Sequence, residues 1–352
     1  MVRLRTIALG GVLLATAGSA EASPWTLPAG TVVVNGSYTY QSASREFFET
    51  GPSRSFPLRG EFTGTTYALG LRAGLTDRLE VEVGVPLRLV SYRSDPVLLL
   101  PRPAMSMESE LDFYQRNVLD LSRVARGVGD LSLAVRWRTP LRLFPLAVEL
   151  RTKIPTGYAG PAGTFGEQPT TIDDFQRDLL RYVRPENVMD DVTLGDGQLD
   201  VQPSLLAGYA FPTRTFLRLD LGMNLRFGGA AQQVVGAVRA GQQLGARVLV
   251  YAYAQAALSL NEGRIIGVSV AAVDPDLPAD RYEGTNNLLL RTPRLERDTV
   301  DVGAGLILRV LPEAELNFGY GRTLWGRYTA LVDSFSISLA VRAQVVRPGA
   351  SP

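Results

Sequence analysis

The sequence predicts an all-β fold: a 12-stranded antiparallel transmembrane β-barrel with short periplasmic turns and long outer loops. Three observations predict it. Apolar and polar residues alternate along segments of roughly ten residues, the connections between segments alternate between short and long, and the chain begins with a secretory signal. Segment 79–91 shows the alternation, with leucine or valine at the odd positions up to Leu89 and Glu80, Glu82 and Arg88 among the even ones. Successive strand side chains point to opposite faces, so this strand has one apolar and one charged face.

The N-terminal residues predict export. Two arginines precede an apolar run, and the small residues Ala20 and Ala22 then fit a cleavage site. We therefore expect a signal peptide at 1–22 and an outer-membrane barrel at 23–352. The mature chain has no apolar stretch near the roughly 18 residues that a spanning helix needs, so strands are expected to cross the membrane. We expect the outer membrane of a Gram-negative bacterium as the location, with outer-membrane lipid and the barrel-assembly machinery as partners.

The segments that fit the strand pattern have the length at which a tilted strand crosses a bilayer. Short turns between them, such as "LTDR" and "FPTR", contain residues that tight turns favour. Outer-membrane barrels combine short periplasmic turns with long outer loops. The strands are expected at 31–41, 65–74, 79–91, 129–139, 144–154, 198–209, 216–227, 246–260, 265–273, 299–311, 315–323 and 331–345. The outer loops are expected at 42–64, 92–128, 155–197, 228–245, 274–298 and 324–330.

Composition argues against several classes of function. The chain has no cysteine and no histidine, and Lys153 is its one lysine. Outer-membrane hydrolases need a positioned base, most often histidine, so we predict neither an enzyme nor a cofactor or metal site. Without the two arginines and one glutamate of the signal peptide, 34 basic and 34 acidic residues remain. A neutral mature chain gives no reason to expect a nucleic-acid partner.

Four motifs carry a resemblance to a known family. They are "GLTDRLEVEVGVP" (74–86), "GVGDLSLAVRWR" (127–138), "LRTKIPTG" (150–157) and "LGDGQLDVQPSLLAGY" (194–209). In their order and spacing the chain resembles the proteobacterial outer-membrane barrels named for the meta pathway of phenol degradation. The resemblance covers nearly the whole mature chain and implies a channel or facilitator for passive uptake or efflux of small hydrophobic or aromatic molecules. The last residues depart from many outer-membrane barrels, which end on an aromatic residue.

Two other functions stay open at this point. The first is a structural or adhesive barrel with a sealed lumen, whose outer loops bind a partner. The second, the translocator of an autotransporter, would need a passenger domain and a lumen helix before the first strand, and few residues separate Ser23 from Thr31.

Charges of both signs recur on the polar faces of the expected strands. A polar lumen can use them in mutual ion pairs that fill the interior, or as a selectivity filter whose slight basic excess favours anionic or polar aromatic solutes. The candidate lumen residues are Arg72, Glu80, Glu82, Arg88, Arg136, Arg138, Glu149, Arg151, Lys153, Arg218, Asp220, Arg226 and Arg309.

Loop 155–197 is long enough to be a candidate lumen constriction. Its segment 170–183 has a threonine three residues before an aspartate and apolar residues at helical spacing, so a helix is expected there. This helix would fold inward as a gate or lie across the rim as a lid. The gate candidates are Asp174, Phe175, Leu179 and Tyr182. Segment 108–125 also has helical spacing, although packing as a solvated loop is the simpler interpretation.

Overall fold

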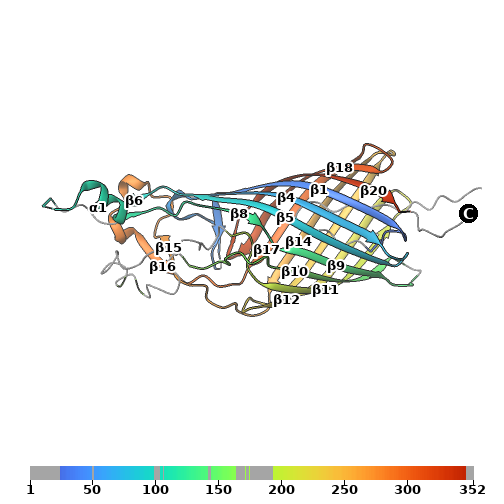
Figure 1. Cartoon of the computed structure of the whole chain (residues 1–352), viewed down its shortest axis with the longest axis horizontal. Coiled ribbons are helices and arrows are strands. Elements are labelled where there is room, and N and C mark those ends of the chain that lie inside the picture. Colours follow the sequence, from blue (N-terminus) through green and yellow to red (C-terminus); the bar gives the residue numbers. More distant parts are fainter. Residues whose placement is uncertain are drawn as a thin grey trace, which may run out of the picture.

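The barrel strands form one continuous antiparallel sheet (Figure 1). The computed structural model describes residues 24–49, 51–98, 104–105, 107–141, 144–163, 171, 174 and 193–345. The strands of the barrel are β1 (Thr31–Ala43), β4 (Glu61–Gly74), β5 (Leu79–Arg93), β8 (Arg123–Val128), β9 (Leu131–Arg138), β10 (Leu146–Ile154), β11 (Leu199–Ala210), β12 (Thr215–Phe227), β13 (Gln233–Leu244), β14 (Val248–Ser259), β17 (Asp298–Arg309), β18 (Ala314–Arg327) and β20 (Asp333–Gln344).

The sheet closes on itself because β1 pairs with β4 on one side and with β20 on the other. Strand β9 pairs with the first half of β5 and β8 pairs with its second half, so β8 and β9 together act as one strand of the ring. The 13 labelled strands therefore form a 12-stranded barrel. Closure leaves no unpaired sheet edge, which is what a strand protein needs in hydrocarbon. No helix among the described residues is long and apolar enough to cross a membrane.

The two faces of the wall differ as the alternation predicted. On β5, Val83, Val85 and Leu87 are 40–54% exposed on the outside, whereas Glu80 and Glu82 are 1% and 3% exposed on the inside. The same division runs around the ring, since outward leucines and valines are exposed on nearly every strand. A wall with an apolar exterior and a charged interior is stable only with lipid outside, because exposed apolar area of this extent is unfavourable in water.

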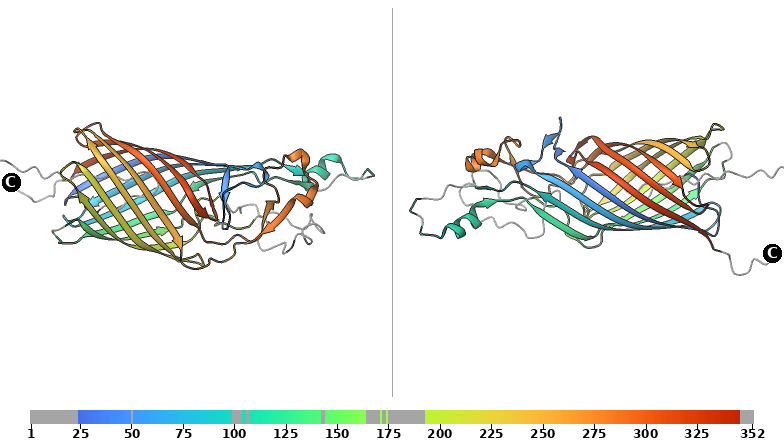
Figure 2. Two further views of the ribbon diagram at one scale, coloured as in Figure 1. Left: turned by 180° about the vertical axis from the view of Figure 1, so that it is seen from behind. Right: turned by 90° about the horizontal axis from the view of Figure 1, so that it is seen from above.

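The two ends of the barrel differ in their connections (Figures 1 and 2). At the short-turn end, where the last strand finishes, the connections are 75–78, 139–145, 211–214, 245–247 and 310–313. The other end, here the long-loop end, carries 44–60, 94–122, 155–198 and 260–297, together with the short links 228–232 and 328–332. The expected asymmetry is therefore present, although two of the six connections at the long-loop end are short.

One barrel strand was missed and one segment was wrongly expected to be a barrel strand, so the expected total of 12 strands was still correct. The expected outer loop 228–245 contains β13, whose inward and outward faces both hold small residues, so its alternation is weak. The expected strand 265–273 is not in the barrel. It contains β15 (Ser269–Ala272), which pairs with β16 (Leu288–Arg291) beyond the long-loop end. Ala271 and Ala272 of β15 are each 2% exposed, so they are buried in this part of the molecule and do not face lipid.

The loop expected at 92–128 ends in β8, which continues the wall beside β5. Strand β5 pairs with β8 at Arg88↔Gly127 and with β9 at Gly84↔Ser132. These two pairs are four residues apart on β5 and five residues apart on the β8–β9 side, so β8 and β9 are separated by a one-residue bulge. Pro86 of β5 lies opposite the bulge and its carbonyl accepts from the Gly129 amide at 2.9 Å. A proline is tolerated here because a bulge interrupts the ladder in any case.

An ordered cap extends from the long-loop end (Figure 2). It is built from β2 (Arg45–Phe47), β3 (Arg54–Ser55), η1 (Pro57–Arg59), β6 (Val97–Leu98), α1 (Glu110–Asn117), β7 (Val118–Leu119), β15, η2 (Ala279–Arg281), η3 (Gly284–Asn287), β16 and β19 (Thr329–Ala330). The cap has a hydrophobic core of its own that includes Phe56, Leu58, Leu119 and Leu288 and continues into Tyr92 of β5.

Helix α1 lies within the second helical candidate, 108–125, but ends at Asn117 because the chain becomes extended at Val118. The Ser109 hydroxyl accepts from the Asp112 amide at 3.1 Å and caps its first turn.

Candidate functional site

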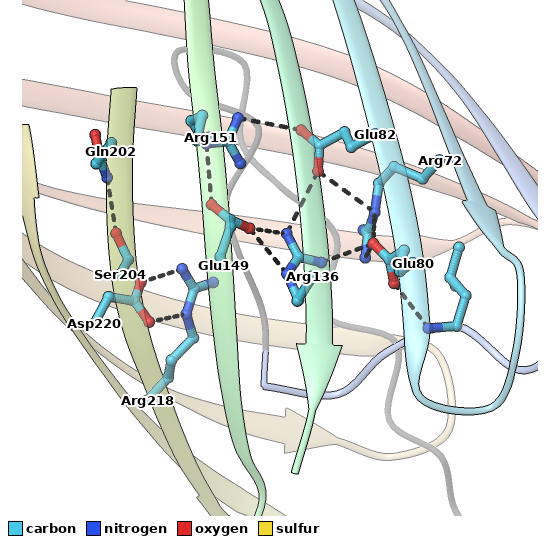
Figure 3. Close-up of polar contacts among 11 residues, drawn as sticks. Arg72, Glu80, Glu82, Arg136, Glu149, Arg151, Gln202, Ser204, Arg218 and Asp220 are labelled. Atoms are coloured by element: carbon cyan, nitrogen blue, oxygen red, sulfur yellow. Dashed lines mark hydrogen bonds and ion pairs between the residues drawn. The ribbon is translucent and has the colours of Figure 1, made fainter. Parts of the chain in front are cut away.

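The lumen is the candidate site, and one side of it carries an ionic network on β4, β5, β9 and β10 near the short-turn end (Figure 3). Adjacent strands place these side chains together because their inward positions share one register, for example Arg72↔Glu82 and Glu149↔Arg136. All six members were expected in the lumen. The ionic network comprises Arg72, Glu80, Glu82, Arg136, Glu149 and Arg151.

Arg136 is the centre of the ionic network and is 2% exposed. Its Nη1 donates to Glu80 Oε1 at 2.7 Å, and its Nε and Nη2 donate to Glu149 Oε2 at 2.9 and 2.6 Å. Its Nη2 also lies 3.5 Å from Glu82 Oε2. One guanidinium therefore joins three strands, which suits arginine because its planar fork presents several donors in fixed directions.

Arg72 and Arg151 complete the charge balance at the two sides of the network. Arg72 Nε donates to Glu80 Oε1 at 2.8 Å, and Arg151 Nε donates to Glu149 Oε1 at 3.1 Å. Three guanidinium groups thus face three carboxylates on a buried wall. Buried carboxylates are tolerated when they are paired and hydrogen-bonded in this way. The geometry fits the interpretation of these residues as mutual ion pairs.

The N-terminal segment 24–29 lies inside the lumen at the short-turn end, a position that the alternation of the strands does not predict. The Leu27 amide donates to Glu80 Oε2 at 2.8 Å, which joins the segment to the ionic network. Leu27 is 3% exposed, and Trp25 packs against Phe216 and Tyr251 of the far wall. The apolar "PWTLP" directly before the first strand was the available sequence signal. The segment narrows the lumen at the short-turn end.

On the neighbouring wall, Arg218 and Asp220 form a pair on β12 (Figure 3). Arg218 Nε donates to Asp220 Oδ1 at 2.9 Å, and its Nη2 donates to Asp220 Oδ2. Arg239 of β13 lies opposite Arg218 in the register. It was not among the expected lumen residues, because its strand was predicted to be the outer loop 228–245. Its guanidinium carbon lies 4.8 Å from the ring centroid of Tyr251 and 5.4 Å from that of Tyr253.

A loop-end cluster joins the barrel to loop 155–198 near the opposite mouth. Lys153 Nζ lies 2.5 Å from Asp196 Oδ1 and 2.7 Å from Asp200 Oδ2, and Arg226 also binds Asp196. Burial alone would raise the pKa of Asp196, but Lys153 and Arg226 outweigh it and hold the pKa below its usual range. Asp196 and Asp200 thus form ion pairs with the lumen side chains Lys153 and Arg226.

Tyr158 ties the start of the same loop to its end. Its hydroxyl donates to Asp130 Oδ1 and accepts from the Gly197 amide at 3.1 Å. Burial and the hydrogen bond to Asp130 raise the pKa of Tyr158 above its usual value, so the phenol stays protonated and remains a donor.

The described parts of loop 155–197 run across the long-loop mouth. Arg88 Nη1 donates to the Leu194 carbonyl at 2.7 Å, which holds this segment against the inner wall. Gly163 donates to the Ile266 carbonyl at 2.8 Å, on the connection between β14 and β17. Among the gate candidates, the Asp174 amide donates to Thr171 Oγ1 at 3.0 Å, as the expected capping arrangement requires. The remaining gate candidates, Phe175, Leu179 and Tyr182, lie outside the described residues.

Two lumen candidates lie at the rim of the short-turn end. Arg138 Nη2 donates to the Asp77 carbonyl at 3.0 Å in an exposed position. Arg309 is exposed and lies 3.2 Å from Glu315 Oε1. Neither side chain joins the ionic network, because each is the last inward residue of its strand.

Two adjoining cavities occupy the lumen between the N-terminal segment and loop 155–198. The outer cavity, of about 490 Å³, is lined by hydroxyl and amide groups such as Ser37 and Thr39, by charged side chains such as Lys153, and by small or apolar residues. The inner cavity, of about 230 Å³, lies against β10 to β14 and the start of β17. Arg151 and Gln202 line both, so they mark the passage from one to the other.

Comparison with known proteins supports the fold. No family model matches the chain, and no curated protein matches it. It is similar to the solved structure of an outer membrane channel from Pseudomonas putida F1, with 13% identity, a TM-score of 0.59, and coverage of 92% of this chain and 100% of that chain. It also matches the TodX deltaS2S3 mutant monoaromatic hydrocarbon channel at 8% identity and a TM-score of 0.44, with coverage of 92% and 93%. The first of these likenesses establishes the fold of an outer-membrane β-barrel.

Proposed function

We propose that this protein is an outer-membrane channel or facilitator for passive passage of small hydrophobic or aromatic molecules. The observation that carries the proposal is the pair of adjoining cavities, of about 490 and 230 Å³, inside a closed barrel with an apolar exterior. Cavities lined by the inward residues of strands on several sides of the ring are what a solute pathway through such a barrel requires.

Location in the outer membrane follows from the same proposal. The exposed outward leucines and valines need lipid, and residues 1–22 have the features of a signal peptide that would deliver the chain to the periplasm. The barrel-assembly machinery would then insert it. In this orientation the short-turn end, with the N-terminal segment, faces the periplasm and the cap faces outward.

The substrate class rests on the resemblance to the barrels named for the meta pathway of phenol degradation. The likeness to the outer membrane channel from Pseudomonas putida F1 covers all of that chain and supports the barrel fold, so the substrate class rests on the resemblance alone. The sequence provides no histidine for a catalytic base, so we propose transport without catalysis.

A sealed barrel with partner-binding outer loops is the second candidate. It is favoured by the N-terminal segment at one end of the lumen and the Arg88 to Leu194 contact at the other, together with a cap that has its own core. Under this alternative the lumen would only support the fold, and the cap would be the surface that binds a partner.

Conductance separates the two candidates. The mature protein would be reconstituted into planar bilayers and into liposomes, and current and uptake of aromatic acids or alkanes would be measured. Current above background together with solute uptake is the expected result. If both are absent, the sealed barrel is correct. A deletion of 170–183 tests the gate: unchanged conductance and uptake would mean that this segment is only a lid.

A further inference from the structure

We infer that the short-turn end of the barrel is a binding surface for the headgroups of anionic phospholipids. The surface is formed by a set of arginines, here the arginine collar, which lie in or directly before the hairpin connections at that end. They are Arg78, Arg138, Arg214, Arg247 and Arg309. The inference goes beyond the proposed function, because it concerns how the barrel meets the membrane and does not require passage of a solute.

The ends of neighbouring strands bring the collar arginines together. The Arg138 amide donates to the Arg78 carbonyl at 2.8 Å, and the Arg309 amide donates to the Arg247 carbonyl at 2.8 Å. Arg214 Nη1 donates, at 3.5 Å, to a carbonyl of the turn that holds Arg247. The collar therefore has one group at Arg78 and Arg138 and a second group along the other three arginines. Like charges on adjacent strands are unfavourable unless an anion balances them.

The carboxylates near the collar are fewer and partly engaged. At the ends of the same set of strands they are Asp77, Glu313 and Glu315. Asp77 Oδ1 accepts from the Ala29 amide at 3.0 Å, and Glu315 lies 3.2 Å from Arg309. Within the part of the chain that the structure describes, the guanidinium groups of Arg78 and Arg247 are exposed and have no hydrogen bond or ion pair. Exposed cations of this kind attract anions from the surroundings.

Apolar side chains identify lipid as those surroundings. Each collar arginine is accompanied at its own hairpin by an apolar residue that continues the outward face of a strand. These residues are Leu75, Trp137, Phe211, Leu244 and Val310, and they are 42–51% exposed. Aromatic and apolar side chains lie at the boundary of a bilayer, and the arginine side chain extends from there to the headgroups. The repetition around the ring places the collar at the depth of the lipid phosphates.

The headgroup that this surface selects carries a net negative charge. Arginine presents its donors in a planar fork that binds two phosphate oxygens at once, and clusters of basic residues at a membrane surface favour anionic lipids. A zwitterionic headgroup offers the same phosphate but adds an ammonium group, which the collar repels. Phosphatidylglycerol lacks that ammonium group and is therefore the preferred partner over phosphatidylcholine.

Two tryptophans of the outer wall make the test possible, because bromine atoms on lipid acyl chains quench the fluorescence of a tryptophan beside them. Trp137 and Trp325 are exposed near opposite ends of the barrel, whereas Trp25 lies in the lumen. A Trp325→Phe variant of the full mature protein keeps Trp137, next to Arg138, as the reporter. Quenching would be compared in vesicles of phosphatidylglycerol and phosphatidylcholine in which one lipid or the other is brominated.

We expect phosphatidylglycerol to be preferred at least about threefold beside Trp137, and the preference to disappear in about 1 M salt, where the screening length is roughly 3 Å. Arg78→Gln with Arg138→Gln should remove the preference. Arg78→Lys with Arg138→Lys should keep most of it, because the charge is retained. Arg126→Gln is the matched control, since Arg126 is exposed on β8, which shares its place in the ring with β9, and it should leave the preference unchanged.

Heat-modifiable migration on gels reports whether each variant is folded. The inference is overturned by equal quenching by the two lipids, by a preference that persists in high salt or in the folded glutamine variant, or by its loss in the glutamine and lysine variants alike. A rim that attracts only soluble anions would give equal quenching together with a chloride-selective current. Conductance does not enter the lipid measurement, so a barrel without current would refute the channel and leave the collar standing.

Discussion

Replacement of Arg136 by methionine is the sharpest test of the ionic network. Methionine matches the arginine side chain as far as Nε and keeps that part of the packing, so the change removes the rest of the guanidinium with its charge and hydrogen bonds. The variant loses the contacts of 2.6–2.9 Å to Glu80 and Glu149 and leaves Glu82 without its 3.5 Å neighbour. Three buried glutamates then face only Arg72 and Arg151.

The expected cost follows from that imbalance. Removing one partner of a buried ion pair costs about 3–5 kcal/mol, because the remaining charge stays buried without compensation. The double variant Arg136→Met with Glu149→Gln leaves two arginines and two glutamates. It should therefore be more stable than the sum of the single changes by at least about 1 kcal/mol, as coupled neighbours in one network are.

Urea unfolding of the barrel in lipid vesicles, followed by tryptophan fluorescence, would measure these free energies. Arg138→Met is the matched control on the same strand, since Arg138 lies in an exposed position at the rim, and it should change the free energy of unfolding by less than about 1 kcal/mol. The reasoning is refuted if Arg136→Met unfolds within about 1 kcal/mol of the unchanged protein, or if the double variant shows simple additivity.

Three further predictions concern other parts of the barrel. Trp25→Ala should raise single-channel conductance several-fold in planar bilayers, since the ring no longer spans to Phe216, and an unchanged conductance would show that the N-terminal segment does not limit flow. The cations beside Asp196 lower the pKa of its carboxyl, so their stabilisation is present above about pH 4, the usual unfolded value, and is lost as pH falls through the lower folded value. Urea unfolding should therefore show Asp196→Asn to be less stable at pH 7, with the difference shrinking below about pH 4; a difference that is constant with pH would contradict the assignment. Leu219→Arg on the lipid face should cost about 2–4 kcal/mol in vesicles, whereas Ser336→Arg on the lumen face should cost much less, and equal costs would reverse the assignment of faces.

The sequence predicted the barrel because lipid and lumen impose opposite chemistry on alternate residues. Segment 79–91 is confirmed residue by residue as part of β5, from the buried Glu80 to the exposed Leu89. Strands in which that contrast is weak were predicted wrongly. Strand β13 presents Val235 and Ala237 inward between Gln233 and Arg239, so its polar face is interrupted, and the residues of β15 were mistaken for a barrel strand because the cap buries them.

The candidate site was predictable in its residue types but not in its connections. The positions of Arg136 and Glu149 on a polar face follow from alternation, yet their contact depends on the register between β9 and β10. Arg239 was not predicted in the lumen, because its strand β13 was predicted to be an outer loop. The lumen position of Trp25 follows from a chain reversal before β1, which no periodic pattern encodes.

The length of the two strands nearest the cap has a consequence for experiments on living cells. Strands β4 and β5 have 14 and 15 residues, more than the roughly 9–11 that cross a bilayer, and β5 reaches the cap, where Tyr92 joins its hydrophobic core. In the connection 94–122 that follows β5, Met105 and Met107 are 95% and 103% exposed. An epitope inserted beside Met105 would stand clear of the lipid headgroups, and antibody labelling of unbroken bacteria would then identify which end of the molecule meets the environment.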